Sequence, residues 1–252
     1  MMPKIAVLGL GEAGGRLAAD LAAAGAEVRG FDPVSTAGPD GVVRAPDAAA
    51  AVDGCDVVLS VNSAAAARAA AGSARGALAG GAVYADLNTA APSLKRELAA
   101  LLDGAAFADV ALLGPVPARG LGTPALASGS GARSFADVLG PLGMPVDVVS
   151  SEAGDAAARK LLRSVFMKGL AAAAVESLEA AAAAGQAAWL ESEIAEVIGP
   201  DLLRRLVEGS RAHAVRRIEE MRAASELLDE LGVEPHVAAA SAEVLARLAR
   251  LG

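Results

Sequence analysis

KIAVLGLGEAG, at residues 4–14, is the stretch of sequence that decides the fold. The apolar run 4–8 predicts a buried β-strand, and the alanine- and leucine-rich segment 16–24 predicts a helix that ends at Gly25. A second predicted strand follows at 27–32 and ends in Asp32. The order of strand, glycine turn, helix, strand and acid is the pattern of a dinucleotide-binding βαβ unit.

The positions of the glycine turn have separate physical tasks in such a unit. Gly9 permits a tight turn, Gly11 leaves room for a pyrophosphate, and Gly14 lets the helix approach the sheet. The free N–H groups at Glu12 and Ala13, together with the positive end of the helix dipole, then bind the phosphates. The alternative is a structural βαβ turn that binds no ligand.

Asp32 predicts the choice of cofactor. Its carboxylate is placed to accept both hydroxyls of an adenine ribose and to repel a 2′-phosphate. No arginine follows it immediately in the sequence. NAD is therefore the expected cofactor, and NADP stays open as the alternative.

The composition excludes several classes of partner. The 252 residues carry a net charge of −8 and only 2% aromatic residues, which argues against a nucleic-acid partner. The most alanine-rich stretch, 170–190, contains two glutamates, so we expect no membrane span. Cys55 is the only cysteine, which excludes an intrachain disulfide and favours a reducing, cytoplasmic location. Two histidines and one cysteine give little for a transition-metal site, and none is expected.

The arrangement of predicted elements divides the chain in two. Strands and helices alternate through residue 150, which predicts an α/β domain with a Rossmann-type, doubly wound, mostly parallel sheet over residues 1–153. The further predicted strands are 42–43, 56–61, 82–85, 107–113, 125–128 and 146–149, and the further predicted helices run from Pro46 to near Gly54, over 64–78 and over 92–102. Between the last three strands we expect only glycine- and proline-rich turns.

Residues 154–252 predict an all-α domain. Helices are expected over 155–184, 186–198, 201–208, 211–231 and 237–251, with breaks at Gly185, Gly199-Pro200, Gly209-Ser210 and Gly232 through Pro235. A helical domain this small and alanine-rich is expected to complete its core by forming a homodimer.

Polar residues follow the predicted strands at their carboxyl ends, where parallel sheets bind ligands. The loops after Leu8, Val61, Ala85 and Leu113 are expected around one cleft. Asn62 should face the nicotinamide half of the cofactor, with Asn88 and Thr89 beside it. Helix capping is an equally good explanation of Asn62 and Thr89.

Lys160 is the best catalytic candidate, and Ser164 lies one helical turn further on the same face. An amine among alanine and leucine side chains is costly to keep charged, so we expect its pKa to be lowered. Such a group can act as a base toward an alcohol or, when protonated, as an acid toward a carbonyl. An exposed helical lysine is the alternative. Lys168 is rotated away from Lys160 and is expected to be peripheral.

Four blocks in a fixed order give the chain a resemblance to the β-hydroxyacid dehydrogenases, the group that contains 3-hydroxyisobutyrate and 6-phosphogluconate dehydrogenases. The blocks are 9–14, 86–92, 109–115 with the downstream Gly122-Thr123, and 154–164. The resemblance implies an active site between a Rossmann domain and a helical domain. It also implies that Lys160 is the general acid/base and that Thr89 lies near the substrate and the nicotinamide.

The chain departs from the family pattern at two places. Leu113-Gly114-Pro115 stands where the family usually has Ser-Gly-Gly, so the serine that would bind a substrate carboxylate is missing. Ser164 replaces an asparagine one turn after the lysine. These changes indicate a divergent branch, in which Leu113 and Gly114 would border the substrate. Imine reductases look similar but generally lack the lysine, which counts against that reading.

The last third offers one more candidate group. His213, Arg216, Arg217 and Glu220 fall on roughly one side of a predicted helix. A solvated face with i,i+4 pairs is the simpler explanation. The sharper hypothesis is that His213 and Arg216 line the cleft and bind an anionic substrate. The expected function is an NAD(P)-dependent oxidoreductase that interconverts a hydroxy compound and its carbonyl. A reductase of C=N or C=C bonds and a non-catalytic dinucleotide-binding protein are the alternatives.

Overall fold

A computed structural model describes residues 2–35 and 38–251 of the chain. The chain forms two compact units, residues 1–160 and residues 161–252, and each is described by itself. The sequence patterns divide the chain at 153/154, where the strands end. The two compact units instead meet seven residues later, inside a long helix.

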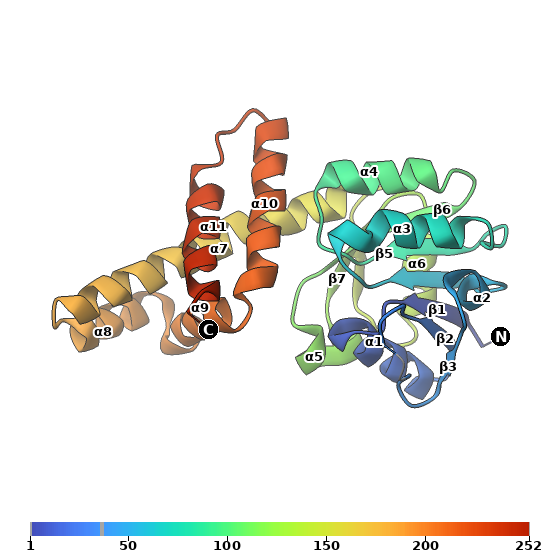
Figure 1. The fold of residues 1–252 in the computed structure, drawn as a ribbon, viewed down its shortest axis with the longest axis horizontal. Coiled ribbons are helices and arrows are strands. Elements are labelled where there is room, and N and C mark those ends of the chain that lie inside the picture. Colours follow the sequence, from blue (N-terminus) through green and yellow to red (C-terminus); the bar gives the residue numbers. More distant parts are fainter. Residues whose placement is uncertain (1, 36–37, 252) are drawn as a thin grey trace. The chain divides into compact units, whose positions relative to one another are not determined.

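The first unit is built on one sheet with the strand order β3-β2-β1-β4-β5-β6-β7-β8 (Figure 1). The strands are β1 (Lys4–Leu8), β2 (Glu27–Phe31), β3 (Val42–Arg44), β4 (Val57–Ser60), β5 (Val83–Asp86), β6 (Ala106–Leu112), β7 (Ala125–Ser128) and β8 (Val146–Val148). Neighbouring strands run parallel except β6 and β7, which are antiparallel. The predicted doubly wound, mostly parallel sheet is confirmed.

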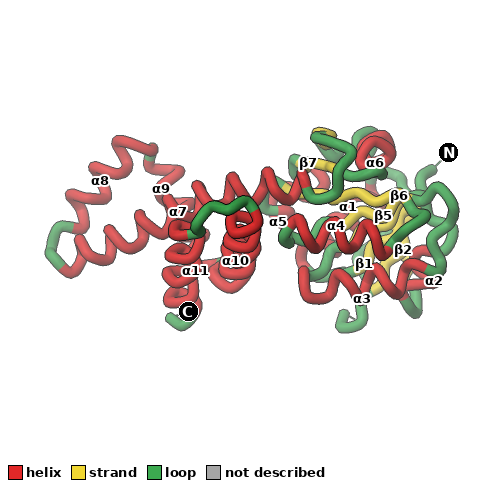
Figure 2. Tube along the Cα trace, turned by 90° about the horizontal axis from the view of Figure 1, so that it is seen from above, coloured by secondary structure: helices red, strands yellow, loops and turns green. Residues whose placement is uncertain are grey.

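Helices cover the sheet on both faces (Figure 2). They are α1 (Glu12–Ala23), α2 (Ala48–Val52), α3 (Ala64–Arg75), α4 (Pro92–Leu101), α5 (Val116–Arg119), the 3₁₀ turn η1 (Gly120–Gly122) and α6 (Ala132–Leu139). The expectation of turns alone between the last three strands is wrong, because α5, η1 and α6 lie there. Phe135 and Leu139 bury the apolar face of α6 against the sheet, so tertiary packing stabilises a short helix within a glycine-rich segment.

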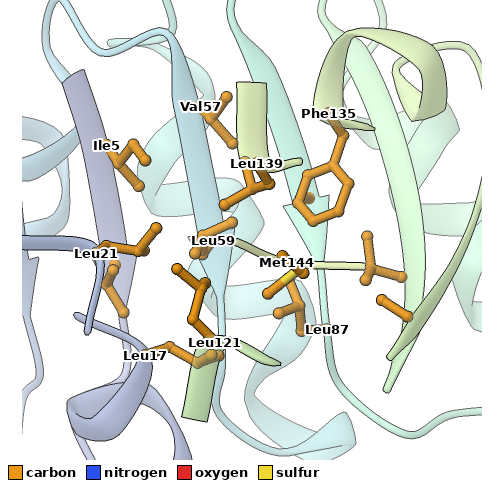
Figure 3. Packing of buried hydrophobic residues seen from close by; sticks show 14 of the residues in the cluster. Ile5, Leu17, Leu21, Val57, Leu59, Leu87, Leu121, Phe135, Leu139 and Met144 are labelled. Carbon is orange, nitrogen blue, oxygen red and sulfur yellow. The ribbon is translucent and has the colours of Figure 1, made fainter. Parts of the chain in front are cut away.

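The two hydrophobic cores follow the alternation of side chains along each strand. Ile5 and Val7 of β1 point into a core that also contains Leu17 and Leu21 of α1 and Phe135 of α6 (Figure 3). Ala6 and Leu8 point to the opposite face, where α2, α3 and α4 pack. The near-continuous burial of β1 and β4 therefore reflects a sheet that is covered on both sides.

The second unit consists of helices. They are the continuation of α7 (Asp155–Ala183), then α8 (Ala187–Ile198), α9 (Pro200–Ala212), α10 (Ala214–Glu230) and α11 (His236–Ala249). The predicted all-α region is confirmed. The predicted break at Gly209-Ser210 is wrong, because α9 runs through both residues and the chain turns at His213. The Arg217 guanidinium packs against Gly209, where a Cβ would lie 2.6 Å from its nearest nitrogen. Among the described helices, none has both the length and the apolar character needed to cross a bilayer.

Candidate active site

Two glycines of the turn after β1 are required by the packing of the chain itself. Gly9 has a φ of +101°, a conformation that side-chain-bearing residues rarely adopt. A Cβ on Gly9 would collide with the carbonyl oxygen of Val61, and a Cβ on Gly14 would collide with the carbonyl oxygen of Gly9. These contacts bring the start of α1 close to the carboxyl ends of β1 and β4.

Gly11 is different, because no contact among residues 2–35 and 38–251 requires a glycine there. Its φ of −64° suits any residue, and a Cβ on it would meet no atom of these residues within 4 Å. Gly11 is also the N-cap of α1, and no side chain caps this helix end. The N–H groups at Glu12 and Ala13 therefore belong to a helix start that faces open space. This arrangement fits the phosphates of a dinucleotide, which need close approach to the backbone and free N–H donors.

Asp32 directly follows β2 and holds the glycine turn. One carboxylate oxygen accepts a hydrogen bond from the Leu10 N–H at 2.7 Å, and the other accepts from Val34 and Ser35. Burial raises the pKa of Asp32, but these three N–H donors and Arg44 lower it further, so the net pKa lies below the ordinary value. Three of the roughly four acceptor positions of a carboxylate are thus used within the described residues. This leaves room for about one ribose hydroxyl, where the sequence suggested two.

Arg44, the last residue of β3, contacts the loop that begins with Asp32. Its Nη2 donates to the carbonyl oxygens of Asp32 at 2.9 Å and Ser35 at 2.5 Å. Sequence reasoning looked only at the residues immediately after Asp32 and missed it. Arg44 supports the loop after β2, and its position places a positive charge beside the Asp32 carboxylate.

Asn62 and Asn88 form an amide pair at the carboxyl ends of β4 and β5. Asn88 Oδ1 accepts from the Asn62 N–H at 2.7 Å, and Asn88 Nδ2 donates to Asn62 Oδ1 at 2.9 Å. Helix capping does not explain these positions. The N-cap of α3 is Ser63, whose hydroxyl accepts from Ala66, and the N-cap of α4 is Ala91. The capping alternatives for Asn62 and Thr89 are therefore wrong.

Lys160 and Thr89 meet in the first unit. Lys160 Nζ donates to Thr89 Oγ1 at 2.7 Å, and the contact is partly buried. The alternative of a lysine that extends into bulk water is therefore wrong. Thr89 follows directly on Asn88, so the amine lies near the loop that also carries the amide pair. An amine beside a hydroxyl at this edge of a sheet can give or take a proton.

Sequence reasoning missed a buried charged group next to this loop. Lys95 of α4 pairs with Asp86 at 2.5 Å and with Asp109 at 3.3 Å, and all three side chains are at most 1% exposed. Burial lowers the pKa of Lys95, but the two carboxylates raise it further, so the ammonium stays charged. One signal was available, because Asp109 stands alone inside the apolar run 107–113.

Ser164 lies in the second unit and is buried. Its hydroxyl hydrogen-bonds to a carboxylate oxygen of Glu220, and it also accepts from Lys168 at 3.2 Å. Lys168 and Glu220 form a mostly buried ion pair at 2.9 Å. Burial lowers the pKa of Lys168 more than Glu220 raises it. Lys168, expected to be peripheral, is thus the direct partner of Ser164, and a contact between Ser164 and a substrate stays a prediction.

The four polar residues expected on one helix side differ in their exposure and in their partners. His213 precedes α10, and both His213 and Arg216 are exposed. Glu220 points inward to Lys168, and Arg217 donates to Ser210 at 2.8 Å. His213 is the N-cap of α10, so it stands at the end of the helix that carries the other three. A role of His213 and Arg216 in binding an anion stays a prediction.

The altered loop follows β6. Leu113 donates its N–H to the Pro124 carbonyl at 2.8 Å, and a Cβ on Gly114 would make only ordinary contacts with Arg119 and Thr123. The backbone of Leu113 is thereby fixed to the strand connection after η1. A contact of Leu113 or Gly114 with a substrate stays a prediction.

Comparisons with known protein families match most of the described chain. Residues 4–139 match the NAD-binding domain of 6-phosphogluconate dehydrogenase. Residues 181–248 match DUF1932, a domain of unknown function. The first match covers the sheet with the glycine turn, and the second lies within the helical unit.

Three individual proteins show how far the similarity extends. A 28.5 kDa protein of Methanothermus fervidus, described as uncharacterized, is 31% identical over 142 residues, and the match spans 55% of each chain. This chain thus spans about half the length of that curated relative. The solved structure of MTH1747 is 28% identical with a TM-score of 0.77 over 98% of both chains, and it is reported to resemble 3-hydroxyacid dehydrogenases. The 3-hydroxyisobutyrate dehydrogenase of Mycobacterium tuberculosis, solved with L-serine, shares the fold at 23% identity, with a TM-score of 0.84 over 99% of this chain and 94% of that one.

Proposed function

We propose that this chain, which belongs to the family with the NAD-binding domain of 6-phosphogluconate dehydrogenase, is an NAD(P)-dependent oxidoreductase. The substrate is a small, anionic hydroxy compound, which the enzyme interconverts with its carbonyl form. Lys160 is the general acid/base. The cofactor is a nicotinamide dinucleotide, and the preference for NAD is part of the proposal.

The observation that carries this proposal is the 2.7 Å hydrogen bond from Lys160 Nζ to Thr89 Oγ1. It holds an amine at the carboxyl edge of a parallel sheet, on the loop that follows β5. The glycine turn and Asp32 follow β1 and β2 at the same edge, where open α/β sheets bind their ligands. The phosphate cradle and the proton-transfer group therefore belong to one edge of one unit.

Each residue has a defined task in the proposed reaction. A bound nicotinamide supplies the chemistry of hydride transfer at its C4. In the oxidation direction, neutral Lys160 would remove the proton from the hydroxyl oxygen, and the carbon that carries this hydroxyl would lose a hydride to the bound nicotinamide. In the reduction direction, charged Lys160 returns the proton to the carbonyl oxygen. Thr89 orients the amine, and the Asn62–Asn88 amide pair fixes the loop that carries Thr89.

The cofactor preference is proposed from Asp32. Its lowered pKa keeps the carboxylate ionised at neutral pH, where it accepts a ribose hydroxyl and repels a 2′-phosphate. Arg44 partly offsets this charge, so the discrimination against NADP is expected to be incomplete.

We further propose that the protein is a cytoplasmic homodimer that associates through its helical unit. Within the described residues, α8 has no buried residue, although it carries Trp189 at 59% exposure and Val197 at 83%. In the proposed dimer, these two side chains belong to the apolar contact surface of α8. The cytoplasmic location is proposed from the single cysteine, Cys55, which is buried and free.

The function is tested with the purified full-length chain. Hydroxy acids and aldehydes are screened with NAD and NADP, together with imines and activated alkenes, and the absorbance of the reduced cofactor is followed. Turnover of a hydroxy acid or an aldehyde supports the proposal. Turnover of imines or alkenes alone would support the reductase alternative, and NAD binding without any turnover would support a binding protein.

The role of Lys160 is tested with Lys160→Ala on the substrate that the screen finds. We expect turnover to fall by roughly 10²- to 10⁴-fold, as is typical on loss of a general acid/base, with the Kd for NAD nearly unchanged. Lys4→Ala, which removes an exposed lysine at the start of β1, is the matched control. Loss of turnover and NAD binding together would instead indicate a structural role for Lys160.

A further inference from the structure

A row of buried polar residues crosses three neighbouring strands of the sheet. Asp86 of β5 and Asp109 of β6 are register partners, and Asp109 in turn faces Ser128 of β7. All three side chains are fully buried. Lys95 lies between the two carboxylates and compensates their charge. A buried group of this kind is costly to desolvate, so its placement calls for an explanation beyond packing.

One side of this row holds the first turn of α7. The Ala157 N–H donates to Asp109 Oδ2 at 2.9 Å, and the Ala156 N–H donates to Ser128 Oγ at 3.0 Å. The first N–H groups of a helix have no partner within the helix. Asp109 and Ser128, which belong to two strands remote in sequence, therefore cap α7. Lys160 follows Ala157 within about one helical turn.

Gly154 adds a third point of attachment for the same helix. Its φ is +105°, and a Cβ on it would lie 3.0 Å from the Cβ of Pro92, the first residue of α4. The chain therefore enters α7 in direct contact with the start of α4. This close approach fixes the position of α7 relative to the loop that precedes α4, which is the loop that carries Thr89.

The other side of the row holds that loop. Lys95 Nζ donates to the carbonyl oxygen of Asn88 at 2.8 Å and to that of Asp86 at 3.0 Å. Asn88 Nδ2 also donates to Asp86 Oδ1 at 2.5 Å. Thr89 is the next residue. The Lys95 ammonium thus contacts two groups. One is the backbone just before Thr89, and the other is the Asp109 carboxylate, which caps the helix that carries Lys160.

We propose that Lys95, Asp109 and Ser128 are positioning residues that fix Lys160 against Thr89. Lys95 holds the Thr89 loop, Asp109 and Ser128 hold the start of α7, and the ion pair between Lys95 and Asp109 joins the two. Packed apolar residues could stabilise this region at least as well, but they would not supply acceptors for the N–H groups of the helix start. The catalytic meaning of this arrangement rests on the proposed function of Lys160.

The test measures the titration of Lys160 directly and needs no substrate. The chain contains four lysines, Lys4, Lys95, Lys160 and Lys168, so ¹³Cε-labelled lysine gives an NMR spectrum simple enough to follow through a pH series. Lys160→Arg identifies the signal of Lys160. Thr89→Val calibrates the effect, because it removes one acceptor of the Lys160 ammonium and should lower the midpoint of the Lys160 titration by about 0.5 pH unit or more.

Ser128→Ala and Asp109→Asn are the test variants. We expect each to lower the Lys160 midpoint by at least about half of the Thr89→Val shift, because the amine loses its fixed place beside Thr89. Ser128→Thr keeps the hydroxyl and should restore the wild-type midpoint. Ser241→Ala is the matched control, since it removes another buried serine hydroxyl, bonded within α11, and should leave Lys160 unchanged.

An unchanged Lys160 midpoint in folded Ser128→Ala and Asp109→Asn would overturn the proposal. If neither variant folds, Ala156→Pro removes the same hydrogen bond from the helix side, because the first turn of a helix accepts proline. An unchanged Lys160 midpoint in Ala156→Pro would also overturn the proposal. If instead Lys160→Ala keeps full turnover on a substrate, the proposed function of Lys160 fails. The titration shifts that show how Lys160 is positioned would still hold, so the two failures are distinguishable.

Discussion

Lys95 Nζ lies 2.5 Å from Asp86 Oδ2, and neither side chain is more than 1% exposed. The register of β5 and β6 places Asp109 beside Asp86, so one ammonium serves two carboxylates. Water screens this group very little, in contrast to the ion pairs on the surface. Removing one partner of this buried pair should therefore cost more unfolding free energy than removing one partner of an exposed pair.

Replacing Lys95 by methionine should destabilise the protein strongly. Two neighbouring buried carboxylates would lose their cation, and removing one partner of a buried ion pair typically costs about 3 to 5 kcal/mol. Urea unfolding followed by circular dichroism measures the free energy of unfolding. Arg68→Ala breaks the exposed pair between Arg68 and Glu97 and should change it little. Equal stability of Lys95→Met and the wild type would contradict the assignment of a charged Lys95 between two charged carboxylates.

The effect of Lys95 should also depend on pH in a defined direction. Its pKa in the folded protein lies above the ordinary value of 10.5. The stabilisation is therefore complete below pH 10.5 and is lost as the pH rises through the folded-state pKa. Above about pH 10 the unfolding free energy should therefore fall more steeply in the wild type than in Lys95→Met, which has no ammonium to lose.

Gly11→Ala should impair NAD binding without impairing the fold. A Cβ on Gly11 meets open space, and its backbone conformation suits alanine, so the expected loss of stability is less than about 1 kcal/mol. The same Cβ would stand where a pyrophosphate approaches, and we expect NAD affinity to fall at least about tenfold. Calorimetry of NAD binding and thermal unfolding provide the two measurements.

Gly9→Ala and Gly14→Ala are the contrasting variants for this prediction. In both, the new Cβ would collide with a backbone carbonyl of the protein, so the melting temperature should drop even without a ligand. If Gly11→Ala binds NAD as tightly as the wild type, the pyrophosphate does not bind at this turn.

Asp32→Ala should relax the discrimination between NAD and NADP. The variant loses the negative charge that repels a 2′-phosphate, so the ratio of the two Kd values should shift toward NADP by about tenfold or more. It also leaves the Leu10 N–H without its acceptor, so NAD affinity should fall as well. Asp32→Asn retains an acceptor oxygen and removes only the charge. A ratio that is unchanged in Asp32→Asn would mean that the charge does not set the preference.

Val197→Glu in α8 should prevent dimer formation. Val197 is 83% exposed on a helix with no buried residue in the described chain, and a charge in an apolar interface is costly. Size-exclusion chromatography with light scattering at micromolar concentration should give a dimer for the wild type and a monomer for the variant. Val34→Glu changes an equally exposed valine of the first unit and should leave the dimer intact. A monomeric wild type would contradict the proposed assembly.

The parts of the fold that follow from local signals could be predicted from the sequence. The run 4–8, the glycines after it and Asp32 each act within a few residues of their own position, and the structure contains the expected strand, helix and strand. The helix α6 was missed because glycines at 129, 131, 140 and 143 surround it, and its stability comes from the burial of Phe135 and Leu139. Whether such a segment forms a helix depends on tertiary packing, which the local sequence pattern does not show.

The candidate site shows the same division. Lys160 and Thr89 could be singled out because both belong to sequence blocks that resemble a known family. Lys95 and Asp109 could not be paired, because their contact depends on where α4 crosses the sheet. Likewise Arg44 is twelve residues from Asp32 and reaches it only because β3 pairs with β2. Contacts between elements remain beyond what spacing along the chain can specify.

The division between the two compact units falls between Lys160 and Leu161, in the interior of α7. Residues on both sides of this division belong to the same helix, so the last turn of the sheet unit is followed directly by helical residues. A gene truncated after codon 160 would encode a sheet unit whose final residue is Lys160, at a frayed end that no following turn supports. In such a fragment Lys160 would lack the helical turn that follows it, so the proposed role of Lys160 depends on residues beyond the sheet unit.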